Sequence, residues 1–144
     1  MTEKPIKILH LYYLGGGIAT SIKLITENLN SNKFEHVILN GLSKEHNKKP
    51  ELSNSKIYSL KFNRHINIFQ DIILFFNTYK ICKREKPNLI HAHSAKGGIM
   101  GKVIAFLLNK PCLHTPQAYS FLSTETKFKK ITVGFTALLY DATS

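Results

Sequence analysis

Three consecutive glycines, Gly15, Gly16 and Gly17, stand between a short apolar run and a helical pattern. Glycines let the backbone approach a ligand closely, and the N–H groups at the start of a helix attract anions. The spacing is neither G-x-G-x-x-G nor a Walker loop, and the second predicted strand ends in Asn40-Gly41 instead of an acidic residue. Because this disfavours a dinucleotide site, we predict that the glycines contact a phosphate or a sugar. A tight turn without a ligand is the alternative.

A second polar segment, HAHSAK, runs from His91 to Lys96. Alternation along a strand puts His91 and His93 on the same face. Two histidines can contribute to a metal site, but no third ligand of matching kind stands nearby in the sequence, so we predict no metal there. We expect one histidine to be packed or hydrogen-bonded and the other to reach a cleft. Ser94 is predicted to cap the next helix, and Lys96 to pair with a phosphate.

A third segment, HTPQAYSF, begins at His114 and mixes polar groups with aromatic rings. Tyr119 and Phe121 suit contacts to a sugar ring, and they suit equally well a loop anchored in the core. We keep Tyr119 as a candidate substrate contact.

Hydrophobic periodicity places these segments between strands and helices. We predict strands at residues 7–12, 36–40, 56–62, 88–93 and 110–115. Helices are predicted at residues 18–29, 66–86, 98–108 and 128–140, with loops at 41–55, 94–98 and 116–126. The alternation predicts an α/β fold, a Rossmann-like doubly wound parallel sheet with helices on both faces. Ligands of such sheets bind outside the carboxyl ends of the strands, where the three polar segments stand.

Residues 1–144 are long enough for a single domain with its own core, since 43% are hydrophobic and 20% charged. The chain carries 20 Lys and Arg against 9 Asp and Glu, a formal net charge of +11. This charge indicates an acidic partner, such as an anionic membrane surface or a phosphorylated substrate, or simply a solvated basic surface. With no zinc-finger, basic-zipper or RNA-binding aromatic pattern, we expect no nucleic-acid partner.

Cys82 and Cys112 lie in apolar contexts and predict reduced thiols of a cytosolic protein. Residues 1–7 are polar, unlike a signal peptide, and no run of about 18 apolar residues could span a bilayer. We therefore expect a cytoplasmic protein whose membrane contact, at the inner face of the plasma membrane, is peripheral.

The segments KILHLYYLGGGIATSI, KPNLIHAHSAKGGIMGKVIAFLLNKP and HTPQAYSFLST together resemble the N-terminal domain of family-4 retaining glycosyltransferases of the GT-B fold. The resemblance covers about residues 7–140 and is greatest to bacterial enzymes that build capsular, exopolysaccharide or lipopolysaccharide chains. It implies an enzyme that moves a sugar from a nucleotide-sugar to an acceptor, often lipid-linked, without a metal or other cofactor. In that family this domain mainly handles the acceptor, and its glycine loop faces the donor phosphates or sugar.

Two departures from the family pattern affect the expected chemistry. Where the family often has Thr-x-His-Gly-Phe, this chain has Gln117 followed by Ala118-Tyr119. The resemblance puts Gln117 at the reacting centre, where an amide can hydrogen-bond a hydroxyl but cannot act as a base. The C-terminal nucleotide-sugar domain of the family is absent from the sequence, so we expect the isolated chain to be inactive without it.

Two other readings remain open from the sequence. The chain could be a non-catalytic module that binds a membrane or an acceptor, or one subunit of a split transferase. A flavodoxin-like domain ranks last, because the first predicted strand leads into neither an acidic residue nor a phosphate loop of serines and threonines.

Overall fold

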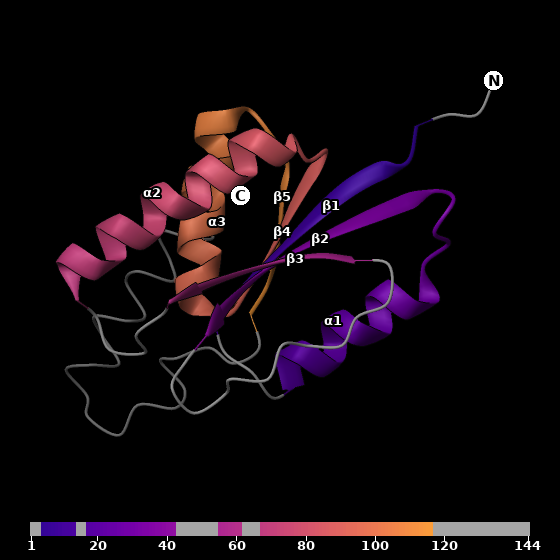
Figure 1. Ribbon diagram of the computed structural model, residues 1–144, viewed down its shortest axis with the longest axis horizontal. Coiled ribbons are helices and arrows are strands. Elements are labelled where there is room, and N and C mark those ends of the chain that lie inside the picture. The colour runs from indigo at the N-terminus through magenta and orange to yellow at the C-terminus, as the bar shows by residue number, and fades with distance from the viewer. Residues whose placement is uncertain (1–3, 14–16, 43–54, 62–66, 117–144) are drawn as a thin grey trace.

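The computed structural model describes residues 4–13, 17–42, 55–61 and 67–116 (Figure 1). Strands and helices alternate along this part of the chain, as the periodicity predicts. In order they are β1 (Ile6–Tyr12), α1 (Gly17–Asn28), β2 (Phe34–Leu42), β3 (Ser55–Lys61), α2 (Ile68–Glu85), β4 (Leu89–His93), α3 (Ala95–Leu108) and β5 (Cys112–Thr115).

The five strands form one sheet in the order β3-β2-β1-β4-β5, and every neighbouring pair is parallel. Parallel neighbours need a crossover connection, which the helices provide. In Figure 1, α1 lies on one face of the sheet, and α2 and α3 lie on the other. The predicted Rossmann-like α/β fold is therefore confirmed.

Alternation along β1 divides the core between the two faces of the sheet. Leu9 and Leu11 point toward α2 and α3, where they pack with buried residues of β2 and β4 and with Leu74, Met100 and Ile104. Tyr12 points to the opposite face and packs against α1. Its cluster there comprises Tyr12, Ile18, Ile22 and Ile38. Because both faces are covered, residues on both sides of β1 are fully buried, such as Leu9, His10 and Leu11.

The helix α3 begins earlier than the sequence predicts. Residues 94–98 were expected to form a loop, but the helix starts at Ala95, so Lys96, Gly97 and Gly98 lie in its first turns. Because glycine is a poor helix former, a prediction from local propensity puts the start of α3 too late in the sequence. Tertiary packing overrides the propensity here, because Gly97 and Gly98 are buried where α3 passes close to β1.

The helices α2 and α3 both end in short turns that lead directly into strands. Lys86 and Asn109 adopt left-handed conformations, with φ of 48° and 50°, and each donates its backbone N–H to a carbonyl in the last turn of its helix. Such a residue satisfies carbonyl groups that the helix end leaves unpaired. Pro87 follows immediately, as the sequence predicts for the end of α2.

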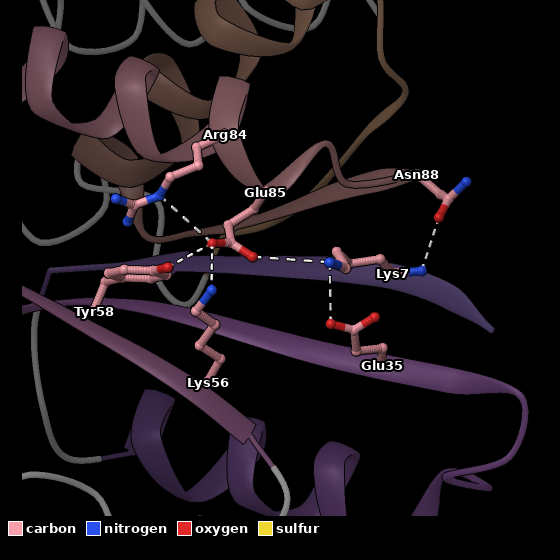
Figure 2. Close-up of polar contacts among 7 residues, drawn as sticks. All are labelled: Lys7, Glu35, Lys56, Tyr58, Arg84, Glu85 and Asn88. Carbon is pink, nitrogen blue, oxygen red and sulfur yellow. Dashed lines mark hydrogen bonds and ion pairs between the residues drawn. The ribbon is translucent and has the colours of Figure 1, made fainter. Parts of the chain in front are cut away.

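A polar cluster around Glu85 joins elements at the amino ends of the strands (Figure 2). The Glu85 carboxylate accepts hydrogen bonds from the Tyr58 hydroxyl at 2.5 Å and from Lys56 Nζ at 2.8 Å, and Lys7 Nζ lies 3.8 Å away. Lys7 Nζ in turn lies 3.1 Å from the Glu35 carboxylate. One buried carboxylate thus ties the end of α2 to β1 and β3, on the edge opposite to the predicted ligand site.

Several sequence predictions fall on residues that the structure does not describe. These are Gly15, Gly16, Gln117, Tyr119 and the helix at 128–140. Among the helices that are described, none has the length and apolar character needed to cross a membrane.

Candidate functional site

The strand order predicts a ligand-binding crevice between β1 and β4. The connection after β1 leads to α1 on one face, and the connection after β4 leads to α3 on the other face. The two connections therefore diverge at the carboxyl ends of adjacent strands, which is where open α/β sheets bind ligands. Tyr13 follows β1 and Gly17 begins α1, so these two residues lie at this edge, whereas Gly15 and Gly16 are outside the described residues. The third polar segment follows β5, which pairs with β4.

The electrostatics of this edge favour an anion. Within the described residues, the first turns of α1 and α3 contain no acidic side chain. The unpaired N–H groups and the dipole of a helix both give its N-terminus a partial positive charge. A phosphate or a sugar hydroxyl at the crevice would face these groups.

Ser94 lies at the junction of β4 and α3 in a strained backbone conformation, with φ of 63° and ψ of 168°. Three hydrogen bonds hold it there. Its N–H donates to the Thr115 carbonyl at 3.4 Å, and its own carbonyl accepts from the Gly98 N–H at 2.8 Å and lies 3.1 Å from His114 Nε2. Strain of this kind persists only where surrounding structure enforces it, and it concentrates at functional sites.

The prediction that the Ser94 side chain caps α3 is wrong. Ser94 occupies the N-cap position, but its side chain makes no cap hydrogen bond. A capping serine normally has an extended backbone, whereas the positive φ of Ser94 turns the side chain away from that geometry. The Ser94 hydroxyl group therefore does not satisfy an N–H group at the start of α3.

Lys96, the predicted phosphate partner, forms an ion pair with Asp71. Its Nζ lies 2.5 Å from Asp71 Oδ1, and both side chains are only about a quarter exposed. The pair joins the first turn of α3 to the first turn of α2. An incoming phosphate would have to compete with Asp71 for the lysine, so the carboxylate sets how strongly Lys96 can attract it.

Tyr13 fixes the point where the glycine segment leaves the sheet. The side chain is fully buried between α2 and α3, with its hydroxyl 3.0 Å from Thr78 Oγ1 and 2.8 Å from Met100 Sδ. Burial raises the pKa of this phenol, so it stays neutral at physiological pH. Tyr13 thus anchors the chain at the end of β1, two residues before Gly15 in the sequence.

The two histidines of the second segment lie side by side, as alternation predicts, with ring centroids 4.0 Å apart. His91 Nε2 is 2.8 Å from Thr115 Oγ1, so this histidine is the hydrogen-bonded one. His93 does not reach the surface: it is only 1% exposed, and neither of its ring nitrogens has a hydrogen-bond partner. Its contact with substrate therefore stays a prediction for a state with a bound ligand.

The structure brings Gly17, Ser94 and Lys96 to one edge and places His93 beneath it. Sequence reasoning missed Asp71, which lies on a separate helix, and the part that His114 plays in holding Ser94. It also missed His10, which stands beside His91 because β1 pairs with β4. Only the period-2 pattern of residues 7–12 hinted that His10 would share a face with Tyr12.

Nearly the whole chain matches a known sequence family. The profile of the glycosyl transferase 4-like family aligns with residues 9–139. The chain belongs to this family. The resemblance that the three sequence motifs carry is thereby confirmed.

Similar proteins agree with this family. A UDP-Gal:alpha-D-GlcNAc-diphosphoundecaprenol alpha-1,3-galactosyltransferase of Escherichia coli is 38% identical over 69 residues, which are 47% of this chain and 18% of that protein. MurG of Acinetobacter baumannii is similar in structure, with a TM-score of 0.64 and 17% identity over 80% of this chain and 36% of MurG.

The same fold also occurs in enzymes of other activity. A UDP-GlcNAc 2-epimerase of Methanocaldococcus jannaschii gives a TM-score of 0.55 at 13% identity, over 76% of this chain and 31% of the epimerase. At such identities the two structural matches show the fold alone. The chain spans only between 18% and 36% of the length of the three proteins named here.

Proposed function

We propose that this chain is the acceptor-side half of a retaining GT-B glycosyltransferase, which moves a sugar from a nucleotide-sugar to a lipid-linked glycan acceptor in cell-surface polysaccharide synthesis. The observation that carries the proposal is the family match over residues 9–139. The galactosyltransferase of Escherichia coli, whose name includes alpha-D-GlcNAc-diphosphoundecaprenol, supports a lipid-linked acceptor. The donor would be bound mainly by a second, C-terminal domain.

In this proposal the crevice between β1 and β4 receives the reacting groups. Gly15, Gly16 and Gly17 offer backbone N–H groups to a phosphate or the sugar, since such groups can approach an anion closely. The Ser94 hydroxyl and the Lys96 ammonium contact the acceptor or a phosphate from the β4 side. These groups stabilise negative charge without a metal ion, so we propose that the transfer itself requires no metal cofactor.

Gln117 and Tyr119 would complete the site from the segment after β5. Gln117 stands where the family often has histidine, and its amide can orient a sugar hydroxyl or carbonyl. It cannot take up a proton at neutral pH, so its role would be positioning. The aromatic face of Tyr119 suits stacking on a sugar ring.

The helix α2 offers a surface for peripheral docking to the inner face of the plasma membrane. Its apolar side chains Phe69, Ile72, Ile73 and Phe76 recur at helical spacing and are all exposed, Phe69 to 82%. The same stripe continues into two exposed lysines, Lys80 and Lys83. Apolar side chains that enter the interface, followed by cations for the headgroups, are typical of helices that lie on anionic membranes. The net charge of +11 supports the same partner.

The first test measures the two binding activities of the chain separately. Co-sedimentation with phosphatidylglycerol vesicles, at low and high salt, reports membrane docking. Thermal shifts with a polyprenyl diphosphate-linked sugar and with nucleotide-sugars report acceptor and donor binding. We expect salt-sensitive vesicle binding and a shift with the lipid-linked sugar. A shift with a nucleotide-sugar alone would overturn the division of labour, because this half would then hold the donor.

Variants of α2 test the docking surface itself. Phe69→Ser with Phe76→Ser should reduce vesicle binding by about tenfold or more, because each exposed phenyl ring contributes roughly 1.5–3 kcal/mol when it is buried. The matched control is Leu24→Ser, an exposed apolar residue of α1 on the opposite face of the sheet. Equal losses in both proteins would contradict docking through α2.

A further inference from the structure

Three histidines from two adjacent strands meet on the face of the sheet that carries α1. His10 of β1 is paired in register with His91 of β4, and His93 follows two residues later. The ring centroid of His10 lies 5.3 Å from that of His91 and 6.1 Å from that of His93. One ring nitrogen from each of the three lies within 4.8 Å of the other two.

Several ring nitrogens of this cluster have no hydrogen-bond partner among the described residues. His10 Nε2 lies 3.1 Å from His36 Nδ1, and His91 Nε2 lies 2.8 Å from Thr115 Oγ1. His10 Nδ1 and both ring nitrogens of His93 are buried without a hydrogen-bond partner. Leaving a buried polar atom unpaired costs about 1–3 kcal/mol, and such atoms are rare in folded proteins. A common partner that binds one ring nitrogen of His10 and one of His93 would remove part of that cost.

The three side chains are also of a suitable chemical type. A neutral imidazole has a free lone pair at one nitrogen, and imidazole is a preferred ligand of zinc, copper and nickel.

We propose that His10, His91 and His93 form a binding site for a divalent transition-metal ion of the zinc type. Bonds of about 2.0–2.1 Å in a tetrahedron put ligand nitrogens roughly 3.3 Å apart, so small rotations of the three rings within the 4.8 Å limit suffice. Three protein ligands leave one position for a water molecule.

The remaining hydrogen bonds of the ligands fit this assignment. When His10 binds through Nδ1, its Nε2 carries the proton and donates it to His36 Nδ1. His91 can bind through Nδ1 in the same way, with its Nε2–H donated to Thr115 Oγ1. Metal-bound histidines almost always donate their second N–H to such a partner, which fixes the ring.

The site would link β1 to β4 directly below the crevice. Its ion would hold the two strands whose carboxyl ends flank the proposed substrate site, and it would orient the His93 ring next to Ser94. The assignment does not depend on the proposed transferase activity, since it rests on the histidine geometry alone.

Binding of the metal alone tests the site. The tag-free chain, freed of metal with a chelator and dialysed, is titrated with Zn²⁺ and in parallel with Co²⁺. We expect about one ion per chain, a higher melting temperature in Zn²⁺, and the intense visible absorption of tetrahedral Co²⁺. No saturable binding by the folded wild-type chain, or only the weak spectrum of octahedral Co²⁺, would overturn the proposal.

Single-residue variants assign the ligands. His93→Gln and, separately, His91→Gln should each abolish the Co²⁺ spectrum while circular dichroism shows that the metal-free chain is folded. His36→Gln is the matched control, a buried histidine of the same cluster that is not a ligand. It should keep about one ion per chain with an affinity roughly tenfold weaker. Unchanged binding in folded His93→Gln and His91→Gln would refute the site.

Discussion

Ser94 shows how one residue can be held in an unfavourable conformation at a candidate site. Its φ of 63° lies in the region that favours glycine, yet the chain has serine there. The strain is enforced from β5 through Thr115 and His114. Under the proposed function, the hydroxyl of this strained serine, which does not cap the helix, contacts the ligand.

Replacement of Ser94 separates backbone strain from the function of the hydroxyl. Ser94→Gly should raise the free energy of unfolding by about 1 kcal/mol, because glycine adopts this conformation without strain. Ser94→Ala keeps the strain and removes only the hydroxyl, so its stability should stay near that of wild type. Both should weaken the response to the lipid-linked sugar. Urea unfolding and the thermal-shift assay measure the two effects. Equal stabilisation by glycine and alanine would contradict this account.

At the scale of elements, the packing of α3 on β4 depends on Gly101, where β4 leaves no space for a larger residue. A Cβ atom at Gly101 would lie 2.5 Å from Ala92 Cβ, whereas one at Gly97 would meet only atoms at 3.4 Å or more. The helix therefore approaches β4 at Gly101 as closely as the backbone allows. This close approach sets the distance between the sheet and the first turn of α3, and therefore the position of Lys96.

Alanine at the two glycines should have opposite effects on stability. Gly101→Ala gains helix propensity but forces α3 away from β4, and we expect a net loss of roughly 1–3 kcal/mol. Gly97→Ala is the matched control in the same helix, where the propensity gain of up to about 1 kcal/mol should remain. Chemical denaturation of both variants provides the comparison. If both substitutions stabilise the chain, the close contact with Ala92 is not a constraint.

The cluster around Glu85 makes a second prediction for the elements. Burial raises the pKa of this carboxyl, but hydrogen bonds from Lys56 and Tyr58, with the charges of Lys56 and Lys7, lower it below the usual value overall. Glu85→Gln removes the charge that three elements share, and should destabilise the chain by about 1–3 kcal/mol. Glu27→Gln, which breaks only the exposed pair with Lys23, should cost less than about 0.5 kcal/mol. If both variants lost a similar amount of stability, the cluster around Glu85 would contribute no more than an exposed ion pair.

For the whole molecule, the histidines make stability depend on pH. Burial lowers the pKa of four histidines on one face of the sheet: His10, His36, His91 and His93. The unfolded chain binds protons near the ordinary pKa of about 6.5, and the folded chain does so only at lower pH. Stability is therefore greatest above about pH 6.5 and falls as the pH decreases toward 3.

Unfolding in urea at pH 7.5, 6.5 and 5.5, in the presence of a chelator, measures this dependence. We expect a continuous loss below pH 6.5, with a limiting slope of about 1.4 kcal/mol per pH unit for each histidine that stays neutral in the folded chain. Removing one of the four, as in His36→Gln, should reduce the slope. A stability that is constant or increases toward pH 5.5 would show that these rings are protonated in the fold.

Local patterns predicted the strands and helices well because each carries its own periodicity, as in residues 7–12 and 66–86. They could not predict the pairing of β1 with β4. Parallel pairing joins segments that are far apart in the sequence, and no local pattern of residues indicates which strands pair. His10 and Asp71 were missed for that reason, because both act on residues of distant elements. The start of α3 was misplaced for the opposite reason: Gly97 and Gly98 signal a loop locally, and only packing shows why a helix tolerates them.

Among the strands that the structure describes, the first along the chain is the central strand of the sheet. β1 can pair with β2 and β3 while the rest of the chain is still being synthesised, but its other edge pairs with β4. That edge therefore stays open, with its apolar side chains, until Leu89–His93 have emerged. An unpaired apolar strand edge is a site for wrong association with other chains. A ribosome that pauses between β3 and β4 would prolong this exposure, so the yield of folded protein should depend on the speed of translation through α2.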